Sequence, residues 1–252
     1  MFTIRTKYWL SLFSFVLVFV SPFVSAQNLG AKYFSFGAIP FDRTVEWVES
    51  TFPASAIQYK RQPEALFLAF DAITRDEEQP QIREIFKGAI KATGRWGSTF
   101  VMFYNRLVQR VDLNFSNEPD VNLFFLSQNT EDSGHRLFVV HKAIKMQGKY
   151  TEVFTQIEDR VSGRLAIEPV VAETRHRGQQ FDTYARIGMW RAPEQIVLVM
   201  VREVNLQAKV SFIHYVYIDT ELWRDYRLLV RQLEGSPQEE SGEGASDALD
   251  AF

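Results

Sequence analysis

The strongest group of side chains with binding chemistry is Arg175, His176 and Arg177, three consecutive basic residues. Two guanidinium groups and an imidazole can together hold a phosphate or a carboxylate through charge-assisted hydrogen bonds. Gly178 follows directly and favours a turn at this place. The alternative interpretation is a basic turn whose side chains are solvated, because only sequence neighbours define the group. We predict these three residues as the candidate ligand-binding site.

Standard catalytic motifs are absent from the sequence. It contains no Gly-x-Ser-x-Gly elbow, no His-Glu-x-x-His zinc helix, no phosphate-binding glycine loop and no dinucleotide fingerprint. Cysteine nucleophiles and thiolate metal sites are excluded because the chain has no cysteine. The four histidines, at positions 135, 141, 176 and 214, are too widely spaced for a local metal motif. We therefore identify no catalytic residue and expect no metal and no cofactor.

Two further places combine polar residues with an expected strand. His214 lies among the apolar residues of a strand that we expect in the sheet centre. We therefore interpret it as a core histidine with satisfied hydrogen bonds rather than a proton shuttle. Arg110 and Asp112 share one face of another expected strand, which we predict to be solvated. They would either orient a ligand or, more ordinarily, serve as partners of charges on a neighbouring strand.

The first 26 residues have the three parts of a secretory signal peptide. Arg5 and Lys7 give a positive start, residues 9–20 are apolar, and small residues precede the expected cleavage after Ala26. The alternative is an uncleaved membrane anchor, for which this apolar segment is short against the roughly 20 residues that a spanning helix needs. We expect the protein to be exported to the periplasm or the extracellular space.

Charge is unevenly distributed along the chain. The net charge is −3, the first 26 residues contribute +2, and residues 234–252 contain six acidic and no basic residues. The body between them is therefore close to neutral, at +1. A neutral body provides no electrostatic case for nucleic-acid binding. Residues 235–252 are rich in Gly, Ser, Glu and Ala, and we predict a disordered tail there. The helix expected at residues 220–233 carries a stripe of Arg224, Arg227 and Arg231. The ordinary interpretation is that this stripe faces solvent. The alternatives are that it binds anionic lipid headgroups or attracts the acidic tail.

Apolar residues at helical spacing predict four helices. The first covers about residues 42–52. The second begins at Pro80, and its apolar side reaches Ile90. The third covers residues 149–162 and ends before Gly163, and the fourth covers residues 220–233, with Asp219 or Thr220 as the expected N-cap.

Runs of β-branched and aromatic residues predict strands between these helices. The expected strands are a hairpin of residues 98–104 and 107–115, a pair of residues 121–127 and 136–142, and two strands at residues 196–201 and 210–218. The last two are apolar on both faces, as in the middle of a covered sheet. This mixture predicts an α+β fold in which helices pack on antiparallel sheets.

A faint repeat suggests two tandem modules. Ala-Ile precedes a helix at residues 38–39 and again at residues 143–144. Gly-Arg-Trp at 94–96 and Gly-Met-Trp at 188–190 each lead into an expected hairpin. We predict helix-then-hairpin modules at residues 27–127 and 128–234, with chance similarity as the alternative.

Residues 37–48, Gly-Ala-Ile-Pro-Phe-Asp-Arg-Thr-Val-Glu-Trp-Val, resemble the loop and short helix that open small exported bacterial modules. These modules resemble two groups of proteins. One has the β-lactamase-inhibitor-protein fold, and the other is represented by the small lipoprotein of the outer-membrane β-barrel assembly complex. The helix at 150–157 and the hairpin near Trp190 resemble the same plan repeated. The chain departs from the pattern in lacking a lipidation cysteine and in having long intervening segments. The resemblance implies a binding or scaffold role and transfers no functional residue.

The leading hypothesis is a non-catalytic exported protein that binds a protein partner of the cell envelope or a secreted partner. We expect no nucleic-acid partner and no integral membrane body, and we leave peripheral membrane contact open. One alternative is an exported hydrolase that brings dispersed Asp, Glu and His residues together on folding. The other is a body that an uncleaved helix anchors in the inner membrane.

Overall fold

The computed structural model describes residues 29–60, 65–68, 80–86, 90–93, 98–116, 119–127, 134–177, 182–205 and 209–235. The predicted signal peptide and residues 236–252 of the predicted tail lie outside the described residues. None of the helices in the described part of the chain has the length and the apolar character required to span a bilayer.

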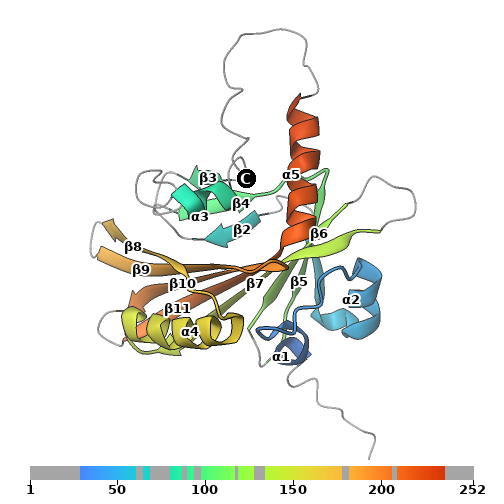
Figure 1. The fold of residues 1–252 in the computed structure, drawn as a ribbon. Helices are drawn as coiled ribbons and strands as arrows, with labels where there is room; N and C mark the ends of the chain where they lie inside the picture. Colours follow the sequence, from blue (N-terminus) through green and yellow to red (C-terminus); the bar gives the residue numbers. More distant parts are fainter. Residues whose placement is uncertain are drawn as a thin grey trace, which may run out of the picture.

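An eight-stranded antiparallel sheet forms the centre of the molecule (Figure 1). Its strands follow the order β1-β5-β6-β7-β11-β10-β9-β8. Their bounds are Ile57–Lys60 (β1), Val108–Leu113 (β5), Val121–Leu126 (β6), Arg136–Gln147 (β7), Val170–Arg177 (β8), Asp182–Arg191 (β9), Gln195–Asn205 (β10) and Val210–Asp219 (β11). A second antiparallel sheet has the order β2-β4-β3, with bounds Ala65–Leu68, Ser98–Met102 and Ile90–Thr93.

Helices cover both faces of the large sheet and complete an α+β fold, as predicted (Figure 1). On one face, which we call the α4 face, lie α1, α2 and α4; on the other, the α5 face, lie α3, the small sheet and α5. The helices are Leu29–Phe34 (α1), Val45–Thr51 (α2), Pro80–Ile85 (α3), Tyr150–Leu165 (α4) and Thr220–Gly235 (α5), and a 3-10 turn spans Ala54–Ala56.

The two strands that are apolar on both faces lie in the middle of the sheet, as predicted. Along β10, Ile196, Leu198 and Met200 are buried in the core beneath α5. Val197 and Val199 alternate with them and are buried in the core beneath α4. A strand covered on both faces needs apolar side chains at successive positions, which explains the continuous apolar run.

The ends of α4 and α5 follow from local chemistry. Asp219 caps α5, because its Oδ1 accepts a hydrogen bond from the Leu222 backbone N–H at 2.8 Å. Helix α4 continues through Gly163, where we expected it to end. Ala166 closes it instead in the left-handed conformation, with φ of 54°, and its N–H donates to the Ser162 carbonyl.

Two predictions on the first half of the chain were wrong. Residues 98–104 and 107–115 do not form a hairpin: β4 pairs with β2 and β3, whereas β5 pairs with β1 and β6. The chain does turn here, since the N–H groups of Leu107 and Val108 donate to the Tyr104 carbonyl. The turn is a corner between two sheets. Ile90, which we expected on α3, begins β3.

The two predicted modules share one sheet. Strands β1, β5 and β6 come from residues 27–127, and β7 to β11 come from residues 128–234. The register between β6 and β7 joins the two groups of strands. The division into modules itself stays a prediction.

Gly188 on β9 is required where α4 packs on the sheet. A methyl group at this position would lie 2.6 Å from the ring of Trp190 and 2.8 Å from that of Phe154, both fully buried. Trp190 cannot shift easily, because its indole N–H donates to the Ser162 hydroxyl at 2.8 Å. We expect Gly188→Ala to lower the free energy of unfolding by about 2–3 kcal/mol through overpacking, as urea denaturation would measure.

Gly163→Ala is the matched control for this substitution. Apart from its chain neighbours and the backbone of α4, no described atom lies within 4 Å of a methyl group built at Gly163, which is exposed within α4. This variant should gain about 0.5–1 kcal/mol, because alanine favours helices over glycine. Equal effects of the two substitutions would contradict the packing that we describe.

Candidate functional site

The three predicted ligand-binding residues lie at the end of an edge strand. Arg175, His176 and Arg177 are the last residues of β8, and they pair in register with Tyr184, Thr183 and Asp182 of β9. These positions therefore form a strand and not the basic turn of the alternative interpretation. Ligand binding at these residues stays a prediction.

A row of polar side chains crosses the α5 face of the sheet. Asn122 on β6 is the cross-strand neighbour of Asp112 on β5 and of His141 on β7. The Asn122 Oδ1 atom lies 2.8 Å from His141 Nδ1, and His141 Nε2 lies 3.0 Å from Nδ1 of His214 on β11. His214 Nε2 is buried and has no hydrogen-bond partner among the described residues. The fold thus joins residues that are far apart in the sequence.

Both histidines of this row have lowered pKa values, which favour their neutral forms in the folded protein. Burial, repulsion from His214 and the charge of Arg110 hold the pKa of His141 well below its usual value. Burial and the charge of Arg202 lower the pKa of His214 to about 3. His214 is therefore a buried core histidine, as predicted, but it is not fully satisfied, because its Nε2 has no hydrogen-bond partner among the described residues. The pair is a buried hydrogen-bonded network that specifies the packing of β7 against β11.

Asp112 belongs to the same row and is 5% exposed, although we predicted that this face of the strand would be solvated. Helix α5, α3 and the small sheet cover this face, which explains the difference. Its carboxylate accepts two hydrogen bonds from Arg110, at 2.6 Å from Nε and 3.0 Å from Nη2. Lys60 on the neighbouring strand β1 lies 3.6 Å away. The interpretation of Asp112 as a charge partner is confirmed.

An open cleft lies on the opposite, α4 face. Helix α4 covers β9, β10 and β11, whereas α1 and α2 pack over β5, β6 and β7, so that β7 and β11 form a floor between the two groups of helices. The volume of the cleft is about 390 Å³. Its described lining residues are Phe34, Ser35, Phe36, Lys142, Ile144, Met146, Gln156, Ile157, Arg160, Val161, Tyr215 and Tyr217.

Aromatic contacts hold the wall of the cleft that the α1 segment supplies. Phe34 stacks on Phe52 with ring centroids 5.8 Å apart, and Tyr33 meets Trp47 edge to face at 5.6 Å. These contacts tie α1 to α2 and the residues that follow it. The Lys142 ammonium group donates to the Phe34 carbonyl at 3.0 Å and so ties the same wall to the floor.

Two cations from different elements face the cleft. Lys142 comes from β7 and is the cross-strand neighbour of Tyr215, and Arg160 comes from α4. Burial raises the pKa of Tyr215, and the positive charge of Arg160 opposes this shift. Burial also raises the pKa of Tyr217, so both phenols are neutral. None of the described lining residues is acidic.

The polar groups of the cleft are mainly hydrogen-bond donors. The described lining offers guanidinium, ammonium, amide and phenol groups, and it contains no imidazole and no carboxylate. Elsewhere in the described part of the chain, no three potential metal ligands come together.

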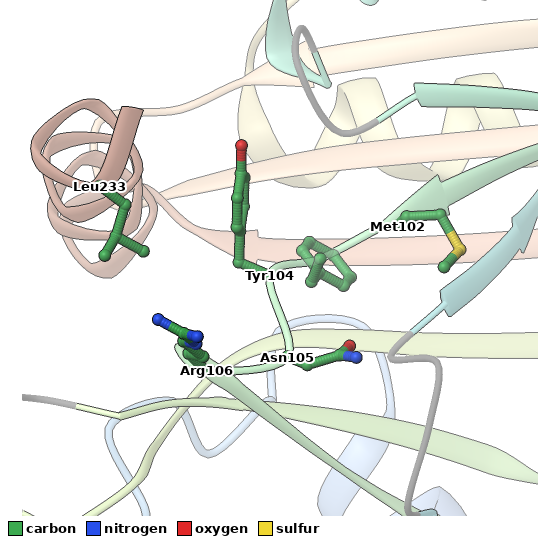
Figure 2. Close-up of a pocket in the computed structure, with 6 residues that line it drawn as sticks. Met102, Tyr104, Asn105, Arg106 and Leu233 are labelled. Atoms are coloured by element: carbon green, nitrogen blue, oxygen red, sulfur yellow. The ribbon is translucent and has the colours of Figure 1, made fainter. Parts of the chain in front are cut away.

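Two other hollows have different chemistry. One, of about 450 Å³, includes Glu84, Glu168 and Arg191 in its lining, so charges of both signs face it. The other, of about 530 Å³, lies between α5 and the residues that follow β4 (Figure 2). Among these three hollows, the cleft beside α4 is the one in which two cations face aromatic walls.

No family model, curated protein or solved structure matches this chain. The resemblance to small exported bacterial modules therefore stays a prediction. A function for this chain must therefore be argued from the geometry of the cleft beside α4.

Sequence reasoning missed Lys142 and Arg160 as site residues. Lys142 is the last residue of an expected strand, and Arg160 lies on the polar flank of an expected helix. The only local signal was the position of Arg160 one turn after Gln156, beside the buried residues Ile157 and Val161. Nothing in the sequence indicated that β7 would pass beneath this flank of α4.

Proposed function

We propose that this chain is a non-catalytic exported binding protein and that it holds a small amphiphilic anion in the cleft between α4 and residues 34–36. The observation that carries the proposal is the convergence of Lys142 and Arg160 on aromatic and aliphatic walls without an acidic residue in the described lining. A carboxylate, sulfonate or phosphate would bind the two cations, and the apolar part of the same molecule would lie against the walls.

The size of the cleft supports a small molecule as the ligand. Small-molecule sites have volumes of about 300–1,000 Å³, apolar linings and a few polar groups that orient the ligand. The cleft has about 390 Å³, and most of its lining residues are apolar or aromatic. Its aromatic wall is already held by ring contacts, so little ordering is required on binding.

Binding of an envelope or secreted protein is the second candidate function. The large sheet ends in β1 on one side and in β8 on the other, and neither strand has a second neighbour among the described strands. Such edges can accept an extended segment of a partner through backbone hydrogen bonds.

Charge reversal at Arg160 tests the proposed site. The probe is 8-anilinonaphthalene-1-sulfonate, an anionic aromatic amphiphile whose fluorescence rises on binding. We expect Arg160→Glu to weaken its binding by about tenfold to a hundredfold, the effect of losing one charge-assisted hydrogen bond of about 1.5–3 kcal/mol. The uncharged analogue N-phenyl-1-naphthylamine should bind both proteins alike.

Arg224→Glu on α5 is the matched control, because it makes the same charge change on an exposed arginine of the other face. The Arg224→Glu variant should bind the sulfonate probe with the same affinity as the unmodified protein. If Arg160→Glu and Arg224→Glu bind the probe equally well, the cleft is not the anion site.

A further inference from the structure

The hollow beside α5 has an apolar wall that the described chain leaves uncovered. The buried stripe of α5 continues through Leu229 to Leu233, which is 41% exposed. Figure 2 shows Leu233 and the ring of Tyr104 on two sides of the hollow, with Met102 further along and Arg106 at the edge. The hollow has a volume of about 530 Å³.

The walls of this hollow are held in place by contacts between α5 and the corner after β4. The Tyr104 hydroxyl donates to the Glu234 carboxylate, and the Tyr104 backbone N–H donates to the Tyr226 hydroxyl at 3.4 Å. Phe103 packs edge to face against Tyr226 with ring centroids 5.8 Å apart. The hollow is therefore preformed.

The chemistry of the hollow calls for an apolar side chain beside a carboxylate. Met102, Phe103, Tyr104 and Leu233 are apolar or aromatic. Arg106 is exposed and forms no ion pair with another residue of the described part of the chain. An occupant that carried only apolar groups would leave this cation without a counter-charge.

We propose that this hollow binds the acidic segment of the chain's own sequence that includes Leu249 and Phe252. Residues 236–252 contain five carboxylates and no basic residue, and these two are the large apolar side chains among them. Asp250 stands directly after Leu249, which matches an apolar wall with Arg106 at its edge. The proposal is independent of the cleft beside α4.

Chain connectivity favours this occupant over a free peptide. Gly235 is two residues beyond Leu233, which itself lines the hollow. Residues 236–249 can span up to roughly 45 Å, so they easily return to the corner after β4. Attachment to the same chain gives an effective concentration in the millimolar range, at which even a weak contact is populated.

Paired cysteines test the proposal, because the chain has no cysteine of its own. Full-length protein with Asn105→Cys and Ala251→Cys would be oxidised under mild conditions, and the disulfide within one chain would be followed by mass spectrometry. The control pair is Leu228→Cys with Ala251→Cys, since Leu228 is exposed on α5. We expect the first pair to cross-link at least about tenfold faster than the second.

Two added changes make the test specific. Leu249→Ser together with Phe252→Ser in the Asn105 pair should reduce its rate to that of the control pair. Arg106→Glu should reduce it as well. Equal rates for the two cysteine pairs, or a rate that these changes leave intact, would overturn the proposal. Disulfide-linked dimers that increase with protein concentration would assign the hollow to a second copy and would also overturn it.

Discussion

Lowering the pH from 6.5 to 4.5 should decrease the free energy of unfolding by up to about 5 kcal/mol through His141 and His214 alone. Both side chains are buried, at 5% and 2% exposure, and hydrogen-bond to one another. Their pKa values lie below the ordinary value of 6.5 because burial and nearby positive charges disfavour the imidazolium form.

The direction of this effect follows from proton uptake by the unfolded chain. Above pH 6.5 both states hold neutral histidines, and the pair has no effect on stability. Below pH 6.5 the unfolded chain takes up two protons that the folded protein excludes, which costs about 1.4 kcal/mol per histidine and pH unit. His214 stays neutral in the folded state down to its pKa of about 3, so its contribution to stability continues to fall until that pH.

Urea denaturation at both pH values would measure the effect. The double variant His141→Gln/His214→Gln removes both titrating groups and keeps side chains that can hydrogen-bond to each other. It should lose less stability than the unmodified protein, by up to about 5 kcal/mol, because the carboxylates contribute equally in both. His214→Gln alone should recover about half of this difference.

His135→Gln is the control, since His135 takes no part in the pair. This variant should keep the full pH dependence of the unmodified protein. If the double variant and the unmodified protein lose the same stability between the two pH values, the histidines are not buried in the neutral form.

Replacing Arg110 by methionine should cost about 3–5 kcal/mol of folding stability, the second large effect that we expect. Asp112 is 5% exposed and accepts two hydrogen bonds from Arg110. Without the guanidinium group, the buried carboxylate keeps, among the described residues, only the more distant cation of Lys60, at 3.6 Å. Breaking a buried ion pair on one side leaves a charge that neither water nor a partner stabilises.

The double variant Arg110→Met/Asp112→Leu should recover most of this loss. A buried ion pair can often be replaced by apolar side chains of similar volume at little cost. The exposed pair Arg136–Asp42 is the control: its side chains are 39% and 60% exposed, and Arg136→Met should cost less than about 1 kcal/mol. A double variant as unstable as Arg110→Met alone would show that the loss arises from packing rather than from the unpaired carboxylate.

The interior of the sheet could be predicted from local sequence because apolar periodicity reports which faces of a segment are buried. The continuous apolar run of β10 placed it in the middle of the sheet, and the stripe of α5 placed Leu222, Trp223 and Tyr226 in the core. Asp219 was predictable as a cap because a capping hydrogen bond joins residues three positions apart.

Pairing between strands was harder to predict where the strands are distant in sequence. The expected hairpin of residues 98–115 had a suitable turn and suitable strands, yet its arms belong to different sheets. Turn chemistry specifies that the chain reverses, but the long-range partners of each strand decide its sheet. The predicted pair of β6 with β7 was easier, because it joins strands adjacent in the sequence.

The residues of the candidate site were also not predictable from local sequence, because they come from segments far apart in the chain. Lys142 and Arg160 meet at one cleft only because β7 passes between α4 and the α1 segment. His141 and His214 are 73 positions apart and share a hydrogen bond because β7 pairs with β11. Arg175, His176 and Arg177, which are adjacent in the sequence, occupy the end of the edge strand β8, where they pair with β9.

The sequence by itself determined the α+β class, the main helices and the two central strands, because each of these depends on the spacing of residues within one segment. Only the tertiary structure decided which polar residues are buried together and which line a cleft. Those properties depend on register and on the packing of helices over a shared sheet, and both are set by contacts between segments far apart in the chain.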